Sequence, residues 1–137
     1  MGIAVRDEDG LVVAAMCANR PYISDPATAE AIAAWMLADL SNKLGFKCII
    51  MEEDSLEIVL SLQREGECRG SYEHFVDDTK YLLNQLEVWN VQHVGRDANT
   101  VAHQLAQHAV TLEGERIWTS DFPNFIWSFV ISEQEAI

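Results

Sequence analysis

The sequence predicts an α/β domain in which helices flank a mixed β-sheet. Three observations carry this prediction. The chain opens with two apolar runs separated by an Asp-Gly turn, which is typical of an antiparallel hairpin. A long amphipathic helix then precedes a short, wholly apolar strand, and a later helix precedes a strand rich in β-branched and aromatic residues. Helices that alternate with buried strands indicate parallel crossover connections.

The first half of the chain has well-marked element boundaries. Residues 3–5 and 11–17 form the two hairpin strands. Asp25 can cap, and Pro26 can begin, a helix that Gly45 ends, because these residue types suit those three positions. One face of this helix carries the apolar side chains of Ala29, Ile32, Ala33, Met36, Leu37, Leu40 and Leu44.

The second half continues the alternation of helices and strands. Its predicted elements are a buried strand over 46–51, a short helix over 55–62, a longer helix over 72–86, a strand over 88–94 and a final helix over 100–110. A chain of 137 residues suits one core, so we expect a single domain, 1–137, with 1–117 as its core and 118–137 as an aromatic-rich tail. Within that tail, periodicity does not decide between strand and helix for 125–131.

Composition excludes several classes of protein. No apolar run approaches the roughly 20 residues that cross a bilayer, and the acidic start lacks the features of a secretory signal. Cys17, Cys48 and Cys68 are an odd number without CxxC spacing, which argues against a disulfide framework and a structural zinc site. We therefore expect an intracellular protein, nuclear or cytoplasmic, that is not secreted and does not bind membranes.

The charge balance concerns the choice of partner. Asp and Glu total 22 against 9 Lys and Arg, for a formal net charge of −13. Proteins that follow a phosphate backbone usually carry a basic stripe, and this sequence has no Lys/Arg cluster. The charge therefore opposes nucleic-acid binding and favours a protein partner.

Three motifs occur in a specific order. They are TAEAIAA around Glu30, MEEDSLEIV around Asp54, and VQHVGRDANTVAHQLAQ, which contains His93 and His103. Together with the opening GIAVRDEDG they resemble the plant ribonuclease H-like family of the type 1 ribonuclease H superfamily, many of whose members are related to reverse-transcriptase-associated domains of retroelements. The resemblance covers nearly the whole chain and implies a ribonuclease H-like mixed sheet flanked by helices.

The resemblance also implies a chemistry and its residues. Such enzymes use two divalent cations, Mg²⁺ or Mn²⁺, to cut the RNA strand of an RNA/DNA hybrid, and these hard cations need clustered carboxylates. By similarity, Glu30 and Asp54 are catalytic metal ligands, and His93 matches a mobile histidine thought to help the product leave. His103 stands where the family has its last acid.

Two of the family's four acids have no counterpart in this sequence. The family's first strand carries one acid and lies at the centre of the sheet, whereas the sequence begins at about the second strand. At the last acidic position, the neutral imidazole of His103 supplies no negative charge for Mg²⁺, which prefers oxygen ligands. We therefore expect the affinity for metal to be much reduced.

Each candidate residue also has an ordinary structural explanation. In the first turn of a helix Glu30 would interact favourably with the helix dipole, whatever its function. Asp54 could be the N-cap of the following helix. His93 and His103, taken as isolated histidines, are more often partly buried residues than metal ligands.

A sheet without its usual central strand would leave buried backbone groups unpaired. Three arrangements would satisfy them: residues 125–131 fill the gap, a strand from a second copy fills it, or the sheet closes up by itself.

The leading interpretation is a degenerate ribonuclease H-like domain with weak or no cleavage of hybrids, which binds a protein partner. An uncovered sheet edge would also favour a homodimer. The alternative is an active, metal-dependent endoribonuclease that binds RNA/DNA hybrids, with Glu53 or Asp97 substituting for a missing ligand. A retroelement remnant without a selected role is a third reading.

Overall fold

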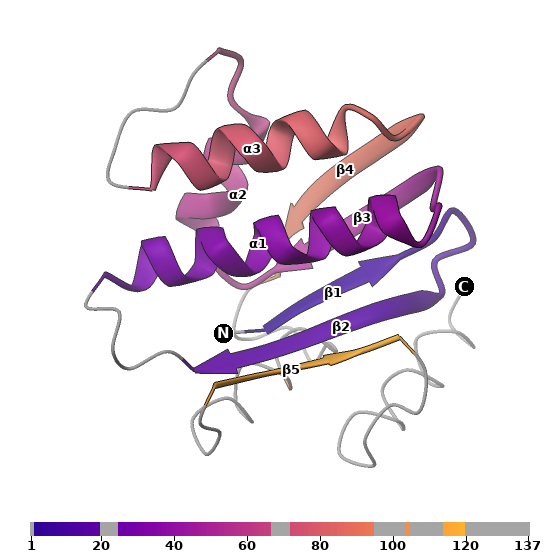
Figure 1. Cartoon of the computed structure of the whole chain (residues 1–137), viewed down its shortest axis with the longest axis horizontal. Coiled ribbons are helices and arrows are strands. Elements are labelled where there is room, and N and C mark those ends of the chain that lie inside the picture. Colours follow the sequence, from indigo (N-terminus) through magenta and orange to yellow (C-terminus); the bar gives the residue numbers. More distant parts are fainter. Residues whose placement is uncertain (1, 20–24, 67–71, 95–103, 105–113, 120–137) are drawn as a thin grey trace.

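The computed structural model describes residues 2–19, 25–66, 72–94, 104 and 114–119. They form an α/β fold, a mixed sheet of five strands flanked by three helices. The elements are β1 (Gly2–Arg6), β2 (Val12–Asn19), α1 (Pro26–Lys43), β3 (Cys48–Glu53), α2 (Leu56–Gln63), α3 (Glu73–Leu83), β4 (Val88–His93) and β5 (Gly114–Trp118). The strand order is β4-β3-β1-β2-β5, and the three helices lie together on one face of the sheet (Figure 1).

β1 and β2 form the predicted antiparallel hairpin. A carboxylate oxygen of Asp7 accepts the backbone N–H of Asp9 at 2.9 Å and that of Leu11 at 3.0 Å. Gly10 has a φ of 81°, a left-handed conformation that glycine adopts at little cost. The Asp7 side chain and the glycine together shape the turn.

The strand pairing in the middle of the sheet decides among the three arrangements that were expected for a sheet without its usual central strand. β1 pairs directly with β3 in antiparallel direction, with Ile3 opposite Glu53 and Arg6 opposite Ile50. Since β2 occupies the other side of β1, the sheet closes up and leaves no place for another strand between β1 and β3. The closed sheet is thus the correct one of the three arrangements, and residues 125–131 lie outside the described residues.

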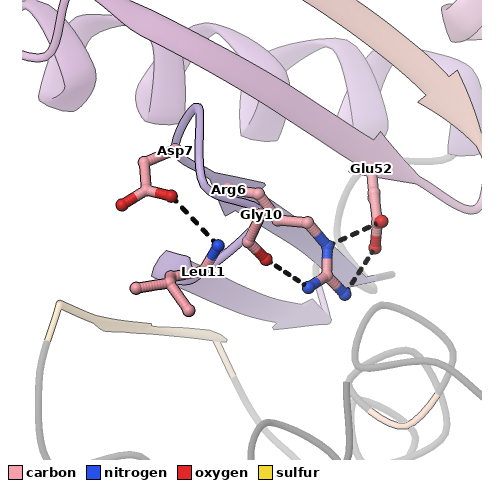
Figure 2. A network of polar contacts seen from close by, with 5 residues as sticks. All are labelled: Arg6, Asp7, Gly10, Leu11 and Glu52. Atoms are coloured by element: carbon pink, nitrogen blue, oxygen red, sulfur yellow. Dashed lines mark hydrogen bonds and ion pairs between the residues drawn. The ribbon is translucent and has the colours of Figure 1, made fainter. Parts of the chain in front are cut away.

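The side chain of Arg6 links β1 to β3 by hydrogen bonds on the face of the sheet away from the helices (Figure 2). Arg6 Nε donates to Glu52 Oε1 at 2.8 Å, and Nη2 donates to Oε2 at 3.4 Å. The third contact runs from Nη1 to the carbonyl oxygen of Gly10 at 2.9 Å. Arg6 of β1 is therefore hydrogen-bonded both to the hairpin turn and to β3.

Helix α1 has the predicted ends but a different buried face. Asp25 accepts the N–H of Ala27 at 3.2 Å and the hydroxyl of Thr28 at 2.7 Å, so it is the N-cap. The expected apolar stripe is only partly correct: Ile32, Met36 and Leu40 are half-buried, and Leu44 is exposed beyond the last turn. The buried residues are mostly small: Ala27, Ala29, Ala31, Ala33, Ala34, Leu37, Ala38 and Ser41. Because α1 packs against α3 as well as the sheet, small side chains at both contacts bring the elements close.

The remaining elements differ from the prediction mainly at their ends. β3 begins and ends two residues later than predicted, so that Glu53 belongs to the strand. β5 was not predicted as a strand, and it pairs antiparallel with β2 at the sheet edge. The predicted final helix lies outside the described residues except for Gln104, which is helical. None of the described helices has the length and apolar character that crossing a membrane requires.

Candidate functional site

Glu30 lies in the second turn of α1, whose first turn contains no acidic residue. The expectation of a first-turn dipole interaction is therefore wrong, because the helix begins at Pro26 and its cap is Asp25. Burial raises the pKa of Glu30, a hydrogen bond with the Ser55 side chain opposes the rise, and the charge of Asp54 adds to it. Glu30 thus faces the junction between β3 and α2.

Ser55 begins helix α2 and links it to this junction. Its hydroxyl oxygen accepts the backbone N–H of Ile58 at 3.4 Å, which makes Ser55 the N-cap of α2. The alternative explanation of Asp54, as the cap of this helix, is therefore wrong. Asp54 is left without that structural role, at the point where β3 turns toward α2.

Glu53 is the last residue of β3, and its side chain points into the interior. It alternates with Ile49 and Met51, which face the helices, and it has no exposed surface. Neither carboxyl oxygen has a hydrogen-bond partner among the described residues. Burial raises the pKa of Glu53 well above its usual range, and the nearby charges of Glu30 and Asp54 raise it further.

His93 ends β4 beside this group of acids. It lies opposite Glu53 in the parallel pairing of β3 with β4, and its ring is exposed. Nε2 lies 3.2 Å from the backbone oxygen of Asp54. Of the sequence-predicted residues, the structure therefore brings Glu30, Asp54 and His93 together, whereas His103 lies outside the described residues.

Whether this junction can hold a divalent cation depends on how the carboxyls of Glu30, Glu53 and Asp54 are arranged. Glu53 has two buried oxygens without partners among the described residues, and Asp54 has one, Oδ1. Unpaired buried carboxyls are costly, and a cation would relieve that cost. However, across the described ranges no group of three or more His, Cys, Asp or Glu side chains converges in a geometry that could hold a metal ion. Among the described residues, the three carboxyls thus lie near one junction but do not converge on one point.

Sequence reasoning placed Glu53 only among possible substitutes and did not identify Ser55. The signal for Glu53 was the period of two that it shares with Ile49 and Met51, which becomes visible once the strand is extended to residue 53. No comparable signal marked the contact of Ser55 with Glu30, because that contact joins two elements far apart in the sequence.

A mixed sheet flanked by helices, with Glu30 on the first helix and Asp54 after the strand that follows it, defines a ribonuclease H-like domain. The model of the reverse transcriptase-like family matches residues 1–109, and the chain belongs to this family. Searches among curated proteins and among solved structures gave no match to the chain.

Proposed function

We propose that this ribonuclease H-like domain cleaves RNA in RNA/DNA hybrids weakly or not at all and acts by binding a protein partner. The direct pairing of β1 with β3 carries the proposal. By the resemblance, the family's first acid lies on a strand between these two, and in the described sheet β1 and β3 are direct neighbours. The carboxyls left at the junction are those of Glu30, Glu53 and Asp54.

The orientation of these carboxyls also supports weak cleavage. Two-cation hydrolysis needs anionic oxygens that converge on both ions. Glu53 is directed into the core, where burial favours its uncharged form. In this orientation Glu53 is therefore poorly suited to hold a cation beside Glu30 and Asp54.

The overall charge favours a protein partner over a nucleic acid. A net charge of −13 repels a phosphate backbone, and the sequence has no basic cluster to offset the repulsion. A protein segment with positive charge would instead be attracted.

An active endoribonuclease is the second candidate, and one observation favours it. Glu53 lies close enough to Glu30 and Asp54 for their charges to affect it. A rearrangement that turned its side chain toward the other two would provide a third ligand. In that enzyme Glu30, Glu53 and Asp54 would hold Mg²⁺ or Mn²⁺, which would activate the attacking water.

The two candidates are separated by a cleavage assay. The full chain is incubated with a labelled RNA/DNA hybrid and Mg²⁺ or Mn²⁺, beside the variants Asp54→Asn and Glu53→Gln. Glu65→Gln is the matched control, since Glu65 is exposed and lies outside the junction. We expect the wild-type chain to cut no faster than Asp54→Asn.

Metal-dependent cutting that is lost in Asp54→Asn and kept in Glu65→Gln would overturn the proposal. If Glu53→Gln also abolished the cutting, Glu53 would be assigned as the substitute ligand of the second candidate.

A further inference from the structure

A cleft of about 330 Å³ lies on the face of the sheet away from the helices. Its floor is apolar and includes Cys48 and Ile50 of β3 and Val88 of β4. Its rim is acidic, with Asp7 and Glu8 from the turn between β1 and β2. Burial and then the Glu8 carboxylate raise the pKa of the Cys48 thiol, so the negative charge of Glu8 acts on the floor of the cleft.

The cleft continues to the open edge of the sheet. β4 is an edge strand, and its residue Val88 donates its N–H to Lys47 O on the β3 side. Because the backbone groups of alternate residues point to opposite sides of a strand, those of Trp89 and Val91 point to the outer edge. The side chain of Gln63 donates to Val91 O at 2.8 Å, while the Trp89 backbone makes no hydrogen bond outside the strand pairing among the described residues.

The composition of β4 leaves this edge receptive to another strand. Natural edge strands are commonly protected by charged residues or proline. The six residues of β4, VWNVQH, include no Asp, Glu, Lys, Arg or Pro. Val88 is 60% exposed at the point where the edge meets the cleft.

We propose that β4 pairs with an added strand from a protein partner, and that an arginine or lysine of this strand occupies the cleft. A residue placed opposite Val88 would lie on the same face of the sheet as Val88 and Cys48, which are neighbours in the pairing of β3 with β4. Adjacent strands are about 4.8 Å apart, so its side chain crosses one strand to reach Cys48. The aliphatic stem covers Val88, and the charged end meets Glu8.

The charges of the chain select this occupant over two others. A second copy of the chain would bring another net charge of −13 and the same acidic turn to the contact. A nucleic acid would bring phosphates to Asp7 and Glu8. A basic, extended segment complements the acidic rim of the cleft and the net negative charge of the chain. This electrostatic attraction also speeds the association of the segment with the chain. This inference rests on the proposed function, since it names the class of protein partner.

The test measures binding of a labelled synthetic peptide of about nine residues in which arginine and valine alternate. The full chain is titrated against it by fluorescence anisotropy. We expect saturable binding that weakens by at least about tenfold in Glu8→Lys and in Val88→Lys. Glu65→Lys is the matched control, with the same change in charge at another exposed site, and we expect it to bind like the wild type. A peptide with glutamine in place of each arginine should bind at least about tenfold more weakly.

Equal weakening by Glu8→Lys and Glu65→Lys would overturn the inference, because general attraction to an acidic chain would then explain the binding. Self-association of the chain that Val88→Lys abolishes would overturn it in favour of a second copy. Hybrid cleavage by the wild-type chain would refute the proposed function but leave these binding data to be judged separately, since Glu8 and Val88 lie outside the acidic junction.

Discussion

Arg6 and Glu52 form an ion pair across β1 and β3, with Arg6 Nε 2.8 Å from Glu52 Oε1. The two side chains are 10% and 12% exposed. The pair joins the two strands whose direct contact distinguishes this sheet from that of a domain with a strand between them. Arg6 also bonds to Gly10 and so connects the hairpin turn to the same contact.

The first prediction is that Arg6→Met destabilises the domain. The substitution leaves the Glu52 carboxylate largely buried without its cation and removes the donor to Gly10. Breaking a buried pair in this way costs about 3 kcal/mol. Urea denaturation, followed by circular dichroism, measures the free energy of unfolding.

Two further variants make this prediction specific to the pair. Arg6→Met combined with Glu52→Met should recover most of the loss, because no uncompensated charge remains. Lys43→Met, which breaks the pair between the exposed Lys43 and the half-buried Asp39, should cost less than about 1 kcal/mol. Equal losses for Arg6→Met and Lys43→Met would show that burial of the first pair has no energetic weight.

The second prediction concerns the pH dependence that Glu53 gives to stability. Its pKa in the folded protein is raised well above 4.5 by burial, then by the charges of Glu30 and Asp54. Folding therefore favours the protonated form. The stability linked to this proton is fully present below the unfolded pKa, about 4.3, and is lost as the pH rises through the folded pKa.

Glu53→Gln removes this titration while keeping the shape of the side chain. We expect the free energy of unfolding of the variant, relative to wild type, to increase as the pH rises above about 4.3. The pKa of Glu30 is also raised, so Glu30 contributes to the pH dependence in the same direction. The free energy of unfolding should therefore depend on pH less steeply in the variant than in the wild type, but the dependence should not disappear. Unfolding is measured with EDTA present, and the exposed Glu65→Gln serves as control. A constant difference across this range would contradict the assigned shift.

Much of the fold was predictable because its signals are local. The hairpin turn depends on Asp7 and Gly10, and α1 depends on Asp25 and Gly45, all of which act on residues a few positions away. The choice among three ways of completing the sheet was not predictable in this way. It depends on the pairing of β1 with β3, about 47 residues apart, and on burial of side chains from both.

The candidate site was predictable to a similar extent. Motif order identified Glu30, Asp54 and His93, and the topology brings all three to one junction. The inward direction of Glu53 was not predicted, because the strand was expected to end at residue 51 and a side chain after a strand has no fixed face. Extending the strand by two residues continues the alternation of faces, and this places the Glu53 carboxyl toward the core instead of water.

The third prediction is that Asp25→Ala weakens α1 at its N-terminus. The Asp25 carboxylate accepts hydrogen bonds from the Ala27 backbone and the Thr28 hydroxyl. Loss of such a cap costs about 1 kcal/mol. Asp25→Ser should retain most of the stability, since serine is also a good cap. Thermal unfolding compares the three proteins, and equal melting temperatures for alanine and aspartate would show that the cap contributes nothing.

The fourth prediction concerns the other end of the same helix. Gly45 has a φ of 78°, and a Cβ atom built on it would meet nothing within 4 Å. Any cost of Gly45→Ala therefore comes from the backbone conformation alone, and we expect about 1 kcal/mol in the free energy of unfolding. Gly45→Asn should lose less, because asparagine tolerates the left-handed region better than alanine. If both variants lost the same amount, the greater tolerance of asparagine for the left-handed region would have no effect at this position, and the backbone explanation would be contradicted.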